Sequence, residues 1–370
     1  MKYYYLSILI AGLFCLASCK KEVEPDPVFP VTPVVPTDPT VSDTISVNVD
    51  LSLVPYQLLS TYRFFTGNMK DMIPNENVLP FEPISSLFTD YASKKRFVWM
   101  PEGVSATYIS DESVFDFPVG AILIKNFYYE RALPEDAQRI LETRLMIRRA
   151  SGWFFATYVW NQQQTEATLS TTGSNVAITF IQDNESYSTT YRIPSNTECM
   201  VCHKLVDDPM PIGVKPQHLN KTLNYSDGSM NQLDKWVSKG YLNSNQGPSL
   251  TLVDYRDASK SLNERVRSHL DINCAHCHAE GKHCDYRPIR LGYSETLNMT
   301  NLGLCVTPDD AFEPGVNNII TPLNPLASMM HLRMNTNDEA IRMPLLGRTM
   351  VHREAVTLLE QYINTIQSCE

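Results

Sequence analysis

Residues 143–160, TRLMIRRASGWFFATYVW, determine the fold expected for the first half of the chain. Aromatic and β-branched residues are concentrated in both halves of this stretch, and such residues favour extended strands. Ser151 and Gly152 separate the two halves and are residue types that suit a tight turn. The stretch therefore predicts a β-hairpin.

Stretches of similar character lie on both sides of this hairpin. Residues 113–129, SVFDFPVGAILIKNFYY, are again rich in aromatic and β-branched residues, and shorter strands are expected at residues 175–181 and 187–193. We therefore expect residues 47–195 to form an all-β, antiparallel sandwich-like domain, with a small barrel as the alternative.

The charged residues exclude one class of partner. The formal net charge is −10, from 31 Lys and Arg against 41 Asp and Glu. Binding to nucleic-acid phosphates depends on clustered basic residues, so this balance argues against a nucleic-acid partner. Arg144, Arg148 and Arg149 flank the predicted turn, and exposed positions on a strand face account for them more simply than an anion site does.

The sequence pattern changes after residue 195, from strands to helices and irregular loops. The residues SLNE at 261–264 have the spacing of a capping box, and apolar residues then recur at helical intervals up to Leu270. A second helix is expected at residues 353–367, where apolar residues form one stripe. The second half of the chain is therefore expected to be mainly α.

Two copies of the motif C-x-x-C-H lie in this helical region, CMVCH at residues 199–203 and CAHCH at residues 274–278. This spacing is the attachment signature of c-type haem. The two thiols bond to one edge of the porphyrin, and the adjacent His then reaches the iron. The motifs predict two covalently bound haem c groups, attached at Cys199, Cys202, Cys274 and Cys277, with His203 and His278 as proximal iron ligands.

Three other uses of these cysteines agree less well with the sequence. A zinc site across both motifs leaves the His after each motif without a role, and it suits a reducing compartment. A redox-active dithiol lacks the βαβ context of a thioredoxin-like domain. A disulfide within each motif does not require a His.

The second haem has the clearer surroundings. Residues 258–370 contain the parts of a cytochrome c-like domain in order: a capped helix entering the motif, a long irregular segment and a closing helix. That segment must supply a sixth iron ligand opposite His278. Met343 is the leading candidate, because Met/His ligation suits electron transfer. The alternatives are His331 and the neighbouring thioethers of Met329, Met330, Met334 and Met350.

The first haem is assigned to residues 196–257, and its distal ligand is left open. An iron without such a ligand keeps an open coordination position, as in a dihaem peroxidase. The candidates for this ligand are Met210, His218, Met230, His276 and His352.

Three further cysteines, Cys284, Cys305 and Cys369, lie downstream of both motifs. In an oxidising compartment Cys284 and Cys305 could form a disulfide that closes the loop after the second motif. Cys369 is next to the last residue and is expected to be free.

The beginning of the chain predicts export. Residues 6–16, LSILIAGLFCL, have the length of a signal-peptide apolar core and are too short to span a membrane. Small residues before Cys19 are typical of a lipobox, so residues 1–18 are expected to be removed and Cys19 to carry lipid. Residues 19–46 are rich in Pro and predict an extended tether.

Segments spread over residues 50–367 carry a family resemblance. They are residues 86–92 (SLFTDYA), 94–103 (KKRFVWMPEG), 117–128 (FPVGAILIKNFY), 157–167 (TYVWNQQQTEA), 272–278 (INCAHCH) and 342–352 (RMPLLGRTMVH). These segments resemble an uncharacterised bacterial family of exported dihaem c-type cytochromes, often encoded near a parallel-β-helix protein. The resemblance implies haem and export and supplies no substrate.

The expected function is electron transfer by an exported, lipid-anchored dihaem c-type cytochrome. It is expected on the periplasmic side of a membrane or at the cell surface. There it would exchange electrons with another redox protein. In this role no catalytic residue is needed. A dihaem peroxidase-like oxidoreductase is the first alternative, and distal ligation separates it from a carrier. The second is a haem-bearing module whose β-rich domain binds a carbohydrate or a protein partner.

Overall fold

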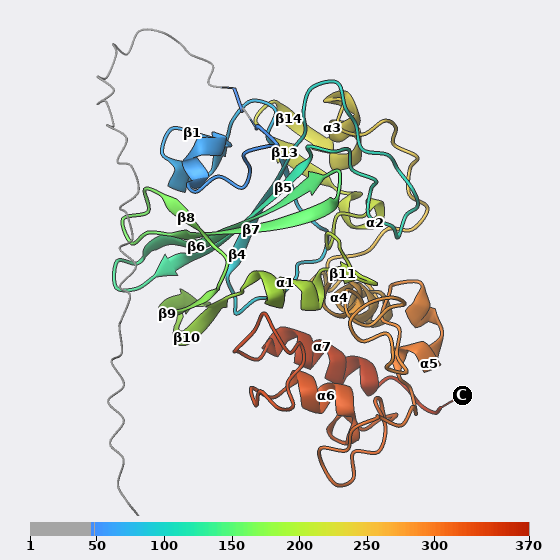
Figure 1. Ribbon diagram of the computed structural model, residues 1–370. Helices are drawn as coiled ribbons and strands as arrows, with labels where there is room; N and C mark the ends of the chain where they lie inside the picture. The colour runs from blue at the N-terminus through green and yellow to red at the C-terminus, as the bar shows by residue number, and fades with distance from the viewer. Residues whose placement is uncertain (1–45, 48, 370) are drawn as a thin grey trace, which may run out of the picture. The chain divides into compact units, whose positions relative to one another are not determined.

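A computed structural model of the protein describes residues 46–47 and 49–369 (Figure 1). The described residues belong to one compact unit. The predicted signal peptide, the lipidation site Cys19 and the tether up to residue 45 lie outside the described residues. Within the described ranges, no helix combines the length and apolar character that a membrane span requires.

The β-rich prediction is confirmed by an eight-stranded antiparallel sheet, which crosses the upper half of Figure 1. Its central path has the order β10-β9-β5-β6-β7-β8, β4 also pairs with β5, and β3 pairs with β4. The strands are β3 (Leu79–Phe81), β4 (Ser93–Trp99), β5 (Ile122–Ala132), β6 (Ala137–Arg149), β7 (Gly152–Trp160), β8 (Ala167–Ser170), β9 (Ser174–Gln182) and β10 (Glu185–Ile193).

The predicted hairpin is present, because β6 and β7 pair with Arg149 opposite Gly152. Pairs of short strands make up the other described sheets: β1 (Phe65–Thr66) with β2 (Ile73–Pro74), β11 (Lys204–Leu205) with β12 (Asp208–Pro209), and β13 (Thr222–Tyr225) with β14 (Gly228–Asn231).

The sandwich prediction differs from the structure, in which non-sheet segments cover both faces of the large sheet. One face packs against Leu59, Tyr62 and Phe64, which precede the sheet in the chain. The opposite face packs against Leu233 and Trp236, which follow it. An alternation of apolar residues with a period of two shows that one face of a strand is covered. It does not show which segment covers that face, so the sequence could not distinguish these segments from a second sheet.

The prediction of helices after the sheet is confirmed. These helices are α1 (Asn196–Cys202), α2 (Pro216–Leu219), α3 (Gln232–Ser238), α4 (Leu262–Leu270), α5 (Met299–Leu302), α6 (Met329–Met334) and α7 (Arg353–Ile363). The capping box predicted at the start of α4 is present, since Ser261 and Glu264 each bond the other's backbone N–H. Helix α7 ends at Ile363, earlier than predicted. Helix α4 packs against α7 around Leu270 and Leu359.

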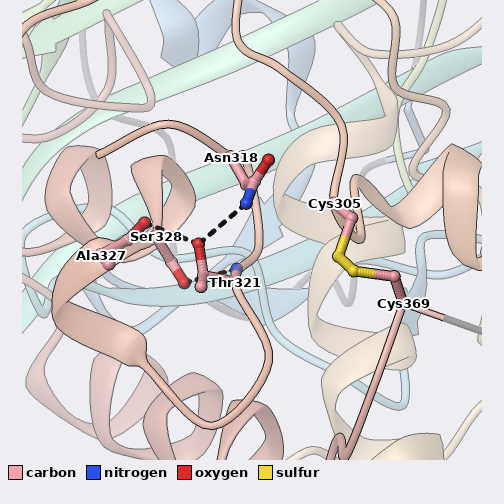
Figure 2. The surroundings of a disulfide bond; sticks show 6 residues. All are labelled: Cys305, Asn318, Thr321, Ala327, Ser328 and Cys369. Atoms are coloured by element: carbon pink, nitrogen blue, oxygen red, sulfur yellow. Dashed lines mark hydrogen bonds between the residues drawn. A yellow bond between two sulfur atoms is a disulfide. The ribbon is translucent and has the colours of Figure 1, made fainter. Parts of the chain in front are cut away.

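The predicted disulfide is wrong, because Cys305 pairs with Cys369, which was expected to be free (Figure 2). Their Cα atoms are 5.8 Å apart, since the chain after α7 returns to the start of the segment that follows α5. Cys284 is buried and free, and its N–H donates to the carbonyl of Cys277. Figure 2 also shows the Thr321 hydroxyl, which donates to the carbonyl of Ala327 at 2.8 Å in the neighbouring loop.

Asp271 is a buried carboxylate that joins three segments of the chain. It accepts hydrogen bonds from His218 Nε2 at 2.6 Å and from the Tyr293 N–H at 2.9 Å, and Lys215 Nζ lies 3.6 Å away. Burial alone would raise the pKa of Asp271, but the charges of Lys215 and His218 outweigh it and hold the pKa well below the usual carboxyl range. The carboxylate therefore stays charged in the interior.

Replacing Asp271 with Asn should lower the free energy of unfolding by roughly 3–5 kcal/mol, because the change leaves buried partners without their counter-charge. Urea unfolding measures the loss. Asp136→Asn is the control, since Asp136 forms an exposed ion pair with Arg131. The folded-state pKa of Asp271 is depressed, so its contribution is present above about pH 4 and is lost as the pH falls further. Equal unfolding midpoints for the two variants would contradict this role.

The Cys305–Cys369 bond should be recovered by peptide mapping without reduction. Its loss in Cys369→Ser should lower the free energy of unfolding by about 2–4 kcal/mol, because the bond closes a long loop in the unfolded chain. Cys284→Ser is the matched control and should leave the bond in place. A mapped Cys284–Cys305 peptide would refute the pairing.

Candidate functional site

The first C-x-x-C-H motif lies on α1, directly after the last strand of the large sheet. Helix α1 begins with a capping box between Ser195 and Glu198, so its first turn is fixed just before Cys199. The His203 N–H donates to the carbonyl of Cys199 and ends the helix. The motif is therefore held on a short, well-capped helix.

The second motif begins where α4 changes its winding. Helix α4 continues into a π-helical turn, Asp271–Ala275, which carries Cys274. Such turns are rare and recur at functional sites. Asn273 in this turn accepts a hydrogen bond from the Phe88 N–H at 2.8 Å and also donates to the carbonyl of Ser86. The turn is thereby fixed to the chain segment before β4.

The two motifs meet in space. The ligand atoms of Cys202, His276 and Cys277 all lie within 4.8 Å of one another. Cys277 Sγ also lies 3.6 Å from the carbonyl oxygen of Val201, so a thiol of the second motif touches the first. A hydrogen bond from Cys277, together with His276, lowers the pKa of the Cys202 thiol. The structure thus brings the two predicted attachment sites into one cluster.

Cys199, Cys202 and His203 line one cavity. His203 Nδ1–H donates to the carbonyl of Met210 at 3.0 Å, which fixes the tautomer and leaves the Nε2 lone pair for a metal. Burial lowers the pKa of His203 to about 3, and the nearby Lys125 adds to the effect. The imidazole is therefore neutral at physiological pH, as an iron ligand must be.

Residues of the second motif line two adjoining cavities. Cys274, His278, Met334 and Met343 line both of them, and the rest of the lining is largely apolar. Burial lowers the pKa of His278 to about 4, so this imidazole is also neutral. His278 Nδ1 is buried and has no hydrogen-bond partner among the described residues. The lining suits an apolar group bound through a histidine.

The structure narrows the ligands predicted to face His278. Met343 lies at the same cavities as His278, but so does Met334, and both thioethers therefore stay candidates. His331 lines neither cavity, and its Nε2–H donates to Glu360 at 2.7 Å. Met329 and Met330 line only the second of the two cavities, and Met350 packs near the sheet.

The candidates for the first site are mostly placed elsewhere. The Met210 carbonyl holds His203, and its sulfur contacts Lys282. The ring of His218 is bonded to Asp271, Met230 is exposed, and His352 lines the second site, where it stacks on Phe88. Of the five candidates, His276 lies at the cavity of the first motif.

Sequence reasoning missed the sheet residues that line the first site. Lys125 and Arg144 face this cavity, and Arg96 faces an adjoining one that also contains His203. Arg144 was expected to be exposed, as were Arg148 and Arg149, and all three are partly buried. The alternation of residues along β6 could have revealed this, because Arg144 falls on the same strand face as the buried Met146.

The cysteines support two different chemistries. As thioethers, Cys202 and Cys277 would each fix one porphyrin edge. As thiolates, they could instead hold one metal ion together with His276, which resembles part of a zinc site. The two uses exclude each other because each consumes the same sulfur atoms.

Comparisons with protein-family models, with curated proteins and with solved structures find no match to this chain. The resemblance to a dihaem cytochrome family therefore stays a prediction, and the chemistry has to be argued from the site.

Proposed function

We propose that the protein is an exported dihaem c-type cytochrome that transfers electrons. One haem would be attached at Cys199 and Cys202 with His203 as proximal ligand. The other would be attached at Cys274 and Cys277 with His278 as proximal ligand, in a cytochrome c-like domain over residues 258–370. The observation that carries the proposal is that Cys199 and His203 line one cavity and Cys274 and His278 line others, while the two motifs touch at Cys202 and Cys277.

This contact favours electron exchange between the haems. A c-type haem is bonded to its cysteines through one edge of the ring, so touching cysteines bring two ring edges close together. Electron transfer is faster over shorter distances. The pair would therefore work as one relay, with a redox protein as partner. The net charge of −10 favours a basic partner surface.

Export and anchoring through Cys19 belong to the same proposal and rest on residues 1–19 of the sequence. The disulfide between Cys305 and Cys369 supports export, because disulfides persist in oxidising compartments.

A dihaem peroxidase-like oxidoreductase is the second candidate. One observation favours it. Of the residues predicted as distal ligands of the first haem, His276 lies at the cavity of the first motif, but it belongs to the second motif. An iron at His203 without a sixth ligand would offer an open position.

Haem content tests the proposal directly. Protein made in a host that attaches c-type haem should keep two haems per chain after denaturation, because thioether bonds are covalent. The Cys199→Ala/Cys202→Ala variant should keep one, whereas the control Cys284→Ser should keep two. A colourless protein that binds one zinc ion would show that the cluster is a metal site instead.

Ligation at the second haem distinguishes Met343 from Met334. Met343→Ala should abolish the weak sulfur-to-iron band of the oxidised spectrum and lower the reduction potential, because a thioether ligand raises it. Met334→Ala should keep the band and is the matched control. Loss of the band in Met334→Ala alone would transfer the assignment to that residue.

A further inference from the structure

Three basic residues form a row across neighbouring strands of the large sheet. Arg96 on β4 is the direct partner of Lys125 on β5, and Lys125 is the direct partner of Arg144 on β6. Like charges that face each other across a strand pair destabilise a sheet. The adjacent row on this face is apolar, since it consists of Val98, Leu123 and Met146. A cost of this kind in a buried position calls for a compensating partner.

The row carries more positive charge than the protein neutralises. Arg144 forms a double hydrogen bond with the fully buried Glu142. The Arg96 side chain, of which 9% is exposed, and the Lys125 side chain form no hydrogen bond or ion pair with any other described residue. Glu82 attracts Arg96, but its carboxylate pairs with Lys221 at 2.9 Å.

The electrostatic result is visible at Arg96 and Lys125, the two groups without a counter-charge of their own. Burial lowers the pKa of Arg96 to about 10. Burial lowers the pKa of Lys125 well below its usual range, and Arg96 and Arg144 add to this effect by repulsion. Arg96 is buried and Lys125 is partly buried, and charges in such positions normally have partners, so two unpaired cations side by side are unusual.

The row faces the first motif. Lys125 and Arg144 line cavities that also contain Cys199 and His203, and Arg96 lines one of these cavities. Phe127 contacts Lys125 and Arg144, with its ring centre 4.8 Å from Lys125 Nζ and 4.3 Å from Arg144 Cζ. The positive groups are therefore presented to the same space as the predicted iron ligand.

We propose that Arg96, Lys125 and Arg144 form an anion site beside His203 that binds a carboxylate or a small oxyanion. The guanidinium of Arg96 can bind such an anion through two parallel hydrogen bonds, and Lys125 adds a point charge. Arg144 keeps its two hydrogen bonds to Glu142 and can offer its remaining N–H groups. The anion comes either from a propionate of the haem, in which case the inference rests on the proposed function, or from solution.

Lys125→Met tests the site, because it removes the central charge and keeps most of the side-chain volume. Lys95→Met is the matched control, since Lys95 is exposed and alternates onto the opposite face of β4. Arg96→Gln is a second site variant, for use if Lys125→Met does not fold. Each is made in the wild-type chain and in the Cys199→Ala/Cys202→Ala chain. Thermal unfolding is followed with acetate or sulfate added at constant ionic strength.

The two sources give different results. If a propionate is bound, Lys125→Met lowers the unfolding midpoint of the haem-loaded chain and raises that of the Cys199→Ala/Cys202→Ala chain, where only repulsion is relieved. If a free anion is bound, acetate or sulfate raises the wild-type midpoint to saturation, and Lys125→Met weakens the apparent affinity at least tenfold.

The inference is overturned if Lys125→Met and Arg96→Gln match Lys95→Met in both chains and in every anion titration. Haem is counted in the same samples, so a failure of the proposed function is recognised separately. If the purified chain contains no haem, the anion titration alone tests whether the anion site exists.

Discussion

The buried carboxylate of Asp271 is the interaction on which the arrangement of the second motif depends. It lies at the first position of the π-helical turn that carries Cys274, and it is bonded to His218 and to the backbone of Tyr293. A charge in a dry interior is stable only with such partners, so its position is narrowly fixed. The carboxylate thereby fixes the turn relative to the segment around α2, which packs against the large sheet.

The meeting of the two motifs follows from how each is fixed. Helix α1 extends directly from the sheet and is held by its capping box, and the π-helical turn is bonded through Asn273 to the segment before β4. Both anchors lead back to the same sheet. The contact between Cys202 and Cys277 is therefore a property of the sheet scaffold, although neither cysteine belongs to a strand.

Local patterns in the sequence predicted local structure well. The hairpin turn is present at Ala150-Ser151, one residue earlier than predicted, and the Ser261–Glu264 capping box is present, because each depends on residues close in the chain. The same box spacing at Ser195 and Glu198 could have located α1. Features that depend on distant residues were missed. The partner of Cys305 depends on the path taken after α7, and the row through Lys125 depends on the register of β4, β5 and β6.

The closeness of Cys202 and Cys277 also constrains how the chain would mature. Outside the cytoplasm, Cys305 and Cys369 must be oxidised, whereas cysteines that receive haem must remain thiols until the vinyl groups arrive. A folded chain without haem would hold two thiols of different motifs within 4.8 Å, where an oxidant could link them to each other. Such a cross-link would block both attachment sites at once. If the chain carries the two proposed haems, their insertion would therefore have to precede final folding, or a reductase would have to keep this pair reduced.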